Sequence, residues 1–500
     1  MKKFLLAFIL ILSQLPLLGA DLPAPKREFR GAWLHIIGQT QWMNMTPAKT
    51  RAYIDDQLNR LQEAGCNAVI FQVRPSADAF YISELEPWTS WATGKRGKAP
   101  DPLWDPMEYT INEAHRRGME FHAWLNPYRV VSNPKEVLPA SHDVNKHPER
   151  YVKFNGQTFF DPAYQENRDF ICKVVADILE RYDVDAIHID DYFYPYPANG
   201  KRFNEDNASY AKFGKGMERH AWRRQNVDLL IEQLHKTIKG NKPWVRFGVS
   251  PFGIWRNRSS DPRGSESSGL QNYDDLYADV LLWADKGWVD YLAPQLYWSL
   301  DLKAAPSRKL VKWWNDNVPQ GVDLYIGQDI QRTMNSADPK AGDSNELATK
   351  IRLSRELPNV KGNVWWHGYW LTGNYKGVAD SLINRHQATL ALPPAYGDRR
   401  VAPAPPRGLH REMRDGVEYL VWDNPLLNPS NPKAEDPVRY VVYEFYPDEE
   451  VDIENPEAIV AVTPFSSMMI GDDQSAPPAG TVYVVTALDR QNRESRPARL

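Results

Sequence analysis

Short apolar segments with the alternation of β-strands recur through the first 390 residues or so, with helical patterns between them. Eight strands are predicted, at 28–36, 67–75, 119–128, 186–189, 245–253, 289–298, 323–329 and 362–370. The helices that follow them are predicted at 47–64, 106–117, 163–182, 216–240, the stretch ending at Gly287, 306–318, 343–356 and 375–392. Eight strand–helix pairs in about 370 residues are typical of an α/β fold, the (β/α)8 barrel. A doubly wound sheet is the alternative, but no glycine-rich dinucleotide turn follows the first strand.

The pattern changes at residues 393–406, where prolines at 393, 394, 403, 405 and 406 indicate a semi-rigid linker. Beyond it, residues 407–500 contain β-rich runs separated by turn signals, which predict a small sandwich of the fibronectin type III sort. We therefore expect a barrel domain over residues 21–392. We also expect the sandwich to fold independently and to be dispensable for catalysis, so that a chain ending near Leu392 stays soluble and active.

The first 20 residues have the form of a secretory signal peptide. Two lysines precede the apolar run 4–12, and Leu18-Gly19-Ala20 offers a cleavage site before Asp21. The run is too short to span a bilayer, so we expect a periplasmic or secreted protein without stable membrane insertion. A retained N-terminal anchor is the alternative.

The composition narrows the class of function. The 500 residues are 42 % hydrophobic and 12 % aromatic, and 60 basic residues against 64 acidic ones leave a net charge of −4. No basic patch indicates a nucleic-acid partner. Cys66 and Cys172 fit small buried hydrophobic positions, because two cysteines so far apart form neither a disulfide framework nor a zinc motif.

The most informative stretch is 184–195, in which the strand 186–189 runs directly into Asp190 and Asp191. Active sites of parallel barrels lie just beyond the carboxyl ends of the strands. Ala186, His188 and Asp190 share one face of this strand by alternation. The simpler interpretation is an Asx turn in which one aspartate caps the next segment.

Polar residues fall in phase on neighbouring strands, which indicates a polar ring inside the barrel. The members are Gln72 and Arg74; His122, Trp124, Asn126 and Tyr128; Arg246 and Ser250; Gln295 and Tyr297; Tyr325 and Asp329. The eighth strand, with tryptophans at 365 and 366, has no definite phase.

Polar groups beside flat aromatic rings suit a carbohydrate, which presents hydroxyl groups at its edge and C–H bonds on its faces. Each tryptophan taken singly is more commonly a core residue. Platform candidates are Trp88, Trp91, Trp255, Trp298 and Trp366. The candidate substrate-binding residues are Arg74, Asn126, Tyr128, Arg129, His188, Tyr192, Trp255, Gln295, Tyr297, Trp298 and Trp366.

Glycoside hydrolysis needs two carboxyl groups, one to protonate the leaving oxygen and one to attack or to activate water. Asp190 is the candidate nucleophile or charge stabiliser, with Arg74 expected to keep it ionised. Asp191 and Asp329 are the candidates for the acid. The loop acids Asp261, Glu266 and Asp301 remain alternatives.

A metal site is the weaker hypothesis. His122, His188 and the two aspartates could ligate an ion, but no HxH or HExxH spacing is present. Buried, hydrogen-bonded histidines fit the pattern better, and we expect neither a metal nor a cofactor.

Several motifs together carry a family resemblance. They are Phe-Arg-Gly-Ala-Trp at 29–33, Val-Ile-Phe-Gln-Val-Arg-Pro at 69–75, Ala-Trp-Leu-Asn-Pro-Tyr-Arg at 123–129, His-Ile-Asp-Asp-Tyr-Phe-Tyr-Pro at 188–195, Ser-Pro-Phe-Gly-Ile-Trp at 250–255 and Pro-Gln-Leu-Tyr-Trp at 294–298. Over residues 27–390 the chain resembles the glycosyl hydrolase-like 10 family. The resemblance implies a (β/α)8 barrel, and bacterial members of the family include envelope hydrolases acting on peptidoglycan glycan strands stripped of peptides.

The sequence thus predicts an exported glycoside hydrolase whose partner is an envelope polysaccharide, with peptidoglycan glycan strands as the expected substrate. The alternative is a non-catalytic glycan-binding protein of the envelope that lacks a competent acid. The C-terminal domain is a candidate surface for an envelope protein partner.

Overall fold

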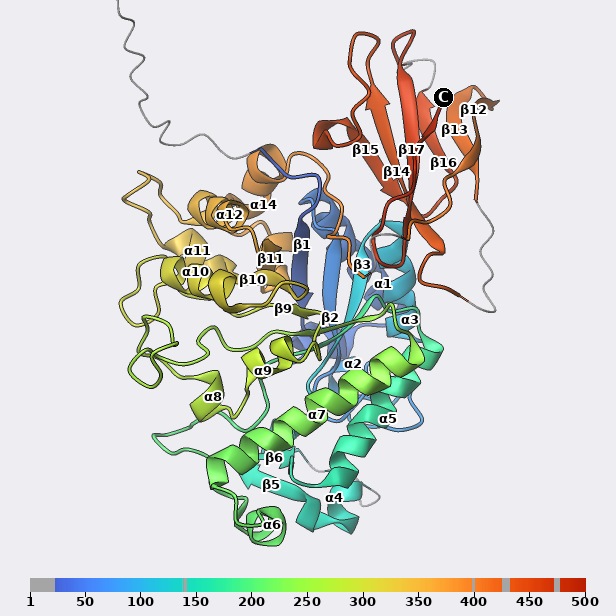
Figure 1. Ribbon diagram of the computed structural model, residues 1–500. Helices are drawn as coiled ribbons and strands as arrows, with labels where there is room; N and C mark the ends of the chain where they lie inside the picture. Colours follow the sequence, from blue (N-terminus) through green and yellow to red (C-terminus); the bar gives the residue numbers. More distant parts are fainter. Residues whose placement is uncertain (1–22, 137, 139–141, 398–400, 425–431, 472–476) are drawn as a thin grey trace, which may run out of the picture.

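The computed structural model describes residues 23–136, 138, 142–397, 401–424, 432–471 and 477–500 (Figure 1). The predicted signal peptide lies outside this described part. Among the helices that are described, none is long and apolar enough to cross a membrane.

Eight parallel strands form a closed barrel in the order β1-β11-β10-β9-β8-β7-β3-β2, which confirms the predicted fold. The ring closes at β1, where Gly31 pairs in register with Ala68 of β2 on one side and Val364 of β11 on the other. The strands are β1 (Phe29–Leu34), β2 (Ala68–Arg74), β3 (Glu120–Leu125), β7 (Ala186–Ile189), β8 (Arg246–Val249), β9 (Tyr291–Leu292), β10 (Asp323–Asp329) and β11 (Val360–Trp366).

Amphipathic helices surround the barrel, and several of them begin at a polar cap. Thr46 accepts a hydrogen bond from the backbone of α1, and Asp105 accepts two from α3. The larger helices are α1 (Pro47–Glu63), α3 (Pro106–Arg116), α5 (Gln165–Arg181), α7 (Arg219–Asn241), α9 (Val280–Asp285), α10 (Ser307–Asn317), α11 (Ile330–Asn335) and α12 (Leu347–Glu356). The predicted closing helix 375–392 is broken into η3 (Tyr375–Gly377), α14 (Val378–Ser381) and a π-helical turn (Leu382–His386).

The barrel separates two apolar layers. Outward residues such as Ile187 and Ile189 join the large core beneath the helices. Inward residues, among them Phe29, Trp124 and Tyr291, form a smaller aromatic cluster inside the ring. The alternation along each strand therefore positions the site residues as well as the core.

The sequence predicts long loops after the barrel strands, but not the short strands and helices that these loops contain. The loop after β3 contains an antiparallel sheet of β4 (Arg129–Val131), β6 (Gln157–Phe160) and β5 (Tyr151–Phe154), which lies at the bottom of Figure 1. The same loop contains the short helices α4 (Asp143–Lys146) and η2 (Pro148–Arg150). Short helices in other loops are η1 (Thr40–Asn44), α2 (Ser90–Thr93), α6 (Asn207–Phe213), α8 (Asn272–Asp275) and α13 (Gly368–Thr372).

The C-terminal domain consists of two antiparallel sheets, as a sandwich requires. One has the order β12-β13-β16 and the other β15-β14-β17-β18. Side chains from both sheets meet in one cluster that includes Leu420, Trp422 and Val442. The elements are β12 (Arg407–Arg414), β13 (Val417–Asp423), β14 (Pro437–Phe445), η5 (Pro456–Ala458), β15 (Ile459–Thr463), β16 (Ser467–Gly471), β17 (Val482–Asp489) and β18 (Ala498–Arg499). That this sandwich is of the fibronectin type III sort stays a prediction.

The C-terminal domain packs against the end of the barrel at which the strands begin (Figure 1). Leu392 lies in the apolar cluster of the second sheet, beside Val441 and Tyr443. Lys26 binds Glu494 at 2.8 Å. The Tyr396 hydroxyl lies 2.8 Å from the Trp244 carbonyl oxygen of the barrel and 2.7 Å from the Arg490 carbonyl oxygen of the C-terminal domain. The predicted boundary between residues 392 and 393 therefore falls inside the interface that the two domains share. This packing favours folding of the two domains together over independent folding.

Candidate active site

Asp190 stands just past the end of β7, on the inner face of the barrel and almost fully buried. Its Oδ2 accepts a hydrogen bond from Trp124 Nε1 at 3.0 Å, and its Oδ1 accepts one from Asn126 Nδ2 at 3.1 Å. The backbone N–H of Tyr192 donates a third at 3.2 Å. Burial raises the pKa of Asp190, while the Arg129 charge and these donors oppose the rise. The carboxylate is held in one orientation by groups that favour its charged form.

The cation acting on Asp190 is Arg129, and the expectation that Arg74 keeps it ionised is wrong. Both guanidinium edges of Arg74 are occupied, since Nε and Nη2 bind Glu86 at 2.7 and 2.6 Å and Nη1 donates to the Asn126 carbonyl oxygen. Arg74 thus supports the backbone that carries Asn126. The register of the β2–β3 pairing shifts between Gln72 and Arg74. Strict alternation along β2 therefore does not predict where the Arg74 side chain lies.

Asp191 is also buried, and its environment differs from that of Asp190. The Tyr196 hydroxyl donates a hydrogen bond to its Oδ2, and Gln295 interacts with the same carboxyl group. Burial, then the charge of Asp190, raise the pKa of Asp191 to about 7. One carboxyl group of the pair is thereby suited to carry a proton at neutral pH.

An aromatic platform stands beside the two acids. The rings of Tyr297 and Trp366 stack with centroids 6.1 Å apart and an interplanar angle of 11°. Trp366 also meets Trp124, the hydrogen-bond donor to Asp190, edge to face at 6.2 Å. The structure resolves the phase of β11: Trp366 joins the inner cluster, whereas Trp365 belongs to the outer core.

Three predicted substrate-binding residues are buried among other side chains, so their contact with a substrate stays a prediction. Tyr128 is fully buried in the outer core, because β3 ends at Leu125 and alternation does not continue beyond it. Trp255 is 2 % exposed and stacks on Trp313 at 5.8 Å, six residues past the end of β8. His188 is fully buried on the face that Asp190 shares.

Three further candidates lie in the segments that follow β7 and β9. Tyr192 is 39 % exposed and has the Arg129 guanidinium over its ring at 4.8 Å. Gln295 donates to the Ser250 carbonyl oxygen at 2.9 Å. Trp298 is half-buried and meets Phe252 edge to face. Their contacts with a glycan stay predictions.

The remaining candidate acids have other structural partners. Asp329 caps α11 by accepting from the Arg332 backbone at 2.7 Å. Asp261, Glu266 and Asp301 each form ion pairs with surface arginine or lysine residues. Asp191 is therefore the better candidate for the general acid.

Sequence reasoning missed Tyr196, the partner of Asp191, and Glu86, the partner of Arg74. Tyr196 lies in the aromatic run that follows the acid pair, and that run was a usable signal. Glu86 is in a long loop, from which nothing in the sequence predicts its approach to β2.

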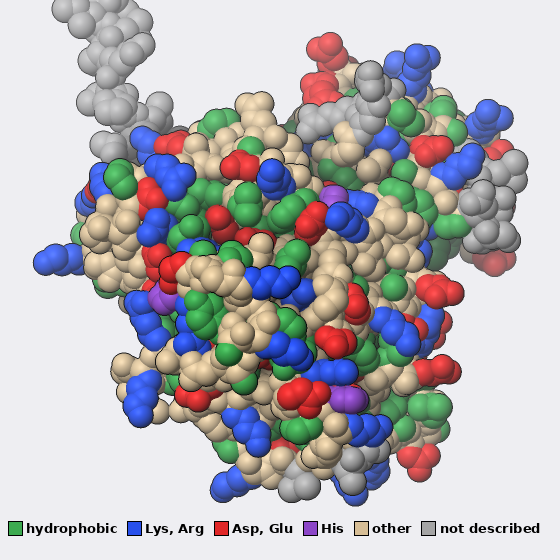
Figure 2. All heavy atoms as spheres, turned by 60° about the horizontal axis from the view of Figure 1, so that its bottom comes forward, with side chains coloured by type: hydrophobic (Ala, Val, Ile, Leu, Met, Phe, Trp, Pro, Cys, Tyr) green, Lys and Arg blue, Asp and Glu red, His purple; other side chains and the backbone are tan. Residues whose placement is uncertain are grey.

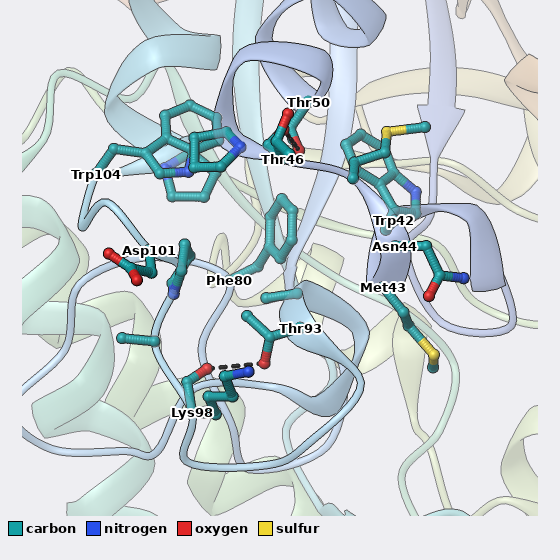
Figure 3. A pocket seen from close by; sticks show the side chains of 16 residues that line it. Trp42, Met43, Asn44, Thr46, Thr50, Phe80, Thr93, Lys98, Asp101 and Trp104 are labelled. Atoms are coloured by element: carbon teal, nitrogen blue, oxygen red, sulfur yellow. Dashed lines mark hydrogen bonds between the residues drawn. The ribbon is translucent and has the colours of Figure 1, made fainter.

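Among the described residues, no group of three or more His, Cys, Asp or Glu side chains could hold a metal ion. A separate cavity of about 240 Å³ lies between the start of α1 and the loop that follows α2 (Figure 3). Trp42, Phe80 and Trp104 line it, together with polar Thr93 and Lys98. None of the acid-pair residues borders this cavity, so it is not the candidate active site.

The comparisons with known proteins agree with this geometry. The family model described as "Glycosyl hydrolase-like 10" matches residues 28–342. The chain belongs to the glycosyl hydrolase-like 10 family. As a family member with a barrel and a buried carboxyl pair at the end of a barrel strand, the protein is a glycoside hydrolase.

Two relatives extend the match. The chain is 37 % identical over 487 residues to "Glycosyl hydrolase YngK" of Bacillus subtilis, covering 94 % of this chain and 92 % of that protein. It is 37 % identical over 380 residues to "Glycosyl hydrolase DigH" of Escherichia coli K12, covering 70 % of this chain and 86 % of that protein.

Solved structures are more distant. The glycoside hydrolase domain of PgaB (BpsB) from Bordetella bronchiseptica has a TM-score of 0.44 at 11 % identity, covering 71 % of this chain and 98 % of that one. The β-amylase catalytic domain from Paenibacillus polymyxa has a TM-score of 0.45 at 10 % identity, covering 69 % and 94 %.

Proposed function

We propose that this glycoside hydrolase is exported and cleaves a bacterial envelope polysaccharide, the glycan strands of peptidoglycan. The observation that carries the catalytic part is the contrast between adjacent carboxyl groups. Burial raises the pKa of both groups, that of Asp191 to about 7, but at Asp190 three hydrogen bonds and the Arg129 charge oppose the rise. Two carboxyl groups in different environments take different roles in glycoside hydrolysis.

In this proposal Asp191 is the general acid. Its proton passes to the oxygen of the leaving sugar as the glycosidic bond breaks. As the bond breaks, Asp190 either attacks the anomeric carbon or stabilises the positive charge that develops there. Trp124 and Asn126 hold its carboxylate during this step. Water then adds to the anomeric carbon, releasing Asp190 where it is bound, and the proton that this water loses restores the acid form of the site.

The glycan assignment draws on the surroundings of the acids. The Tyr297–Trp366 stack offers flat surfaces to the C–H faces of a sugar ring. The Arg129 guanidinium, which lies over the ring of the partly exposed Tyr192, supplies a cation at the same site. A cation suits a polymer that bears carboxyl groups, as stripped peptidoglycan strands do. In Figure 2, basic and acidic side chains are interspersed over the face turned forward, with no broad basic patch on it.

Turnover of purified glycan strands tests the proposal. We expect the protein to release shorter fragments from strands stripped of peptides, detected by mass spectrometry, and Asp190→Asn to release almost none. Strands that are bound but not cut would instead support the non-catalytic binding protein. Recovery of the mature chain from periplasmic or culture fractions tests export separately, and a purely cytoplasmic location would contradict it.

A further inference from the structure

A row of buried hydrogen bonds crosses the inside of the barrel beneath Asp190. Glu120 Oε2 lies 3.0 Å from His122 Nε2, and His122 Nδ1 lies 2.8 Å from the Tyr291 hydroxyl. The same hydroxyl lies 2.9 Å from His188 Nδ1. A side-chain carbon at Gly248 would come within 1.9 Å of the Tyr291 ring, so the glycine in β8 leaves the space that this ring fills. All four side chains are at most 1 % exposed.

The upper end of this row reaches the active site. His188 Nε2 lies 2.9 Å from Ser250 Oγ and 3.2 Å from Trp33 Nε1. Trp33 in turn meets both Tyr297 and Trp366, the two rings of the platform, edge to face. His188 therefore sits two residues below Asp190 on the same face of β7 and contacts the residue that supports the platform.

The hydrogen-bond partners assign a direction to the row. An indole nitrogen only donates, so His188 Nε2 must accept from Trp33 and the His188 proton is on Nδ1. That proton goes to the Tyr291 oxygen, and the Tyr291 hydroxyl hydrogen goes to His122 Nδ1. His122 then donates from Nε2 to the Glu120 carboxylate. A second proton on His188 would point at the Trp33 N–H, and a second proton on His122 would point at the Tyr291 hydroxyl hydrogen. In each case two donors would face each other.

The lower end of the row is completed by the C-terminal domain. Asn492, in the turn after β17, donates from Nδ2 to Glu120 Oε1 at 2.6 Å. Arg439 donates to Asn492 Oδ1 at 2.6 Å, which orients the amide so that its NH₂ group faces Glu120. Asn492 is fully buried and has a backbone φ of 56°, a conformation that asparagine tolerates.

We propose that these contacts form a relay of fixed polarity, in which Asn492 of the C-terminal domain and Trp33 of the barrel together hold His188 as its neutral Nδ1–H tautomer beneath Asp190. His188 and Asn492 are positioning residues and touch no substrate. The C-terminal domain then contributes to catalysis from the far end of the barrel.

The polarity has an electrostatic consequence. From Trp33 through His188 and Tyr291 to His122, every hydrogen points away from the active site, toward Glu120. The negative end of each of these bond dipoles therefore faces the position above β7. Positive charge develops there at the anomeric carbon during bond cleavage. Oriented dipoles in a buried site stabilise such charge without reorganisation.

Several charged or titratable groups surround Glu120 and determine whether it stays ionised. His122 is on its own strand, Asp185 precedes β7, Arg246 begins β8, and Arg439 and Tyr396 come from the C-terminal side. Burial opposes ionisation, but the hydrogen bond from His122 and the Arg439 charge hold the pKa of Glu120 below its usual value. Burial holds the pKa of His188 well below its usual value, which keeps this ring neutral.

The test is Asn492→Asp in the full chain. The new carboxylate lies beside Glu120, so the two carboxyl groups together retain a proton to higher pH. A protonated Glu120 can donate to His122, which reverses the direction of the hydrogen bonds in the row. We expect the acidic limb of the kcat/KM profile on glycan strands to move up by about one pH unit, which is an activity about tenfold lower on that limb. Activity should recover as the pH is raised.

Arg490→Ala is the matched control, because Arg490 lies in the same turn and pairs with Asp183 of the barrel without contacting Glu120. We expect its pH profile to match that of the parent. If Asn492→Asp lowers activity by one factor at every pH, the residue is merely structural and the relay is refuted.

Histidine-labelled protein gives a readout independent of activity and of the substrate assignment. Long-range ¹H–¹⁵N spectra should show His188 as the Nδ1–H tautomer in the parent and a tautomer mixture in Tyr291→Phe, which removes the central hydroxyl and keeps the ring. A parent spectrum with the His188 proton on Nε2 would overturn the proposal. Retained tautomer order with no glycan turnover would leave the relay standing and refute the proposed substrate.

Discussion

The hydroxyl group of Tyr196 donates a hydrogen bond to a carboxylate oxygen of Asp191, five residues earlier in the chain. This bond favours the charged form of Asp191 and opposes the burial and the Asp190 charge that raise its pKa to about 7. Tyr196 therefore limits the pH range over which Asp191 keeps its proton.

We predict that Tyr196→Phe moves the alkaline limb of the pH–rate profile upward. Loss of the donor raises the pKa of Asp191 further, so the acid stays protonated to higher pH. Profiles of kcat/KM on glycan strands between pH 5 and 9 measure the shift. A downward or absent shift would show that another group is the acid.

Asp191→Asn should change the pH dependence of stability. In the parent, the raised pKa of Asp191 stabilises the folded state below about pH 4, and this contribution is lost as the pH rises toward 7. The raised pKa corresponds to at most about 4 kcal/mol of unfolding free energy. Between pH 5 and pH 8, urea unfolding should show the stability of the variant rising relative to that of the parent. Asp285→Asn, at an exposed position, should show no such trend.

Asp190→Asn should lower the rate on glycan strands by about a hundredfold or more, with little change in folding. The amide keeps the shape but lacks the charge that opposes an oxocarbenium ion. An added small anion that partly restores cleavage in Asp190→Ala would identify the nucleophile role. Asp329→Asn is the control, and a larger loss there than at Asp190 would reverse the assignment.

Trp366→Ala should weaken substrate binding more than it slows the chemical step. Loss of the stacked ring removes one face for a sugar, and about 1.4 kcal/mol of contact energy raises KM about tenfold. Steady-state kinetics on a series of strand lengths would show this. A similar fall in kcat at saturating substrate, with KM unchanged, would instead show that Trp366 binds the transition state more strongly than the substrate.

A chain ending at Leu392 should fold poorly, contrary to the expectation from the sequence alone. The truncation exposes Leu392, removes the Asn492 amide from Glu120 and leaves Lys26 without Glu494. Solubility and circular dichroism of the truncated chain measure the outcome. A stable, active fragment would restore the view of two independent domains and would also argue against the relay.

The barrel could be predicted because the strand alternation of 186–189 and 323–329 reflects burial directly, and both ranges match β7 and β10. Asp190 and Gln295 were placed on the inner face for the same reason. The prediction failed where regular geometry stops. Tyr128 lies past the end of β3, and the register shift near Arg74 breaks the alternation of β2. Contacts such as Arg74–Glu86 depend on loop conformation, which no local pattern encodes.

The contact between Asn492 and Glu120 spans 372 positions of the sequence. A growing chain cannot make it until every barrel strand and nearly all of the C-terminal domain have been synthesised. Contacts so distant in sequence carry a large loop-closure cost and form late. The carboxylate of Glu120 thus stays without its amide partner during most of synthesis, and the barrel acquires its finished interior only as the last strands of the chain fold.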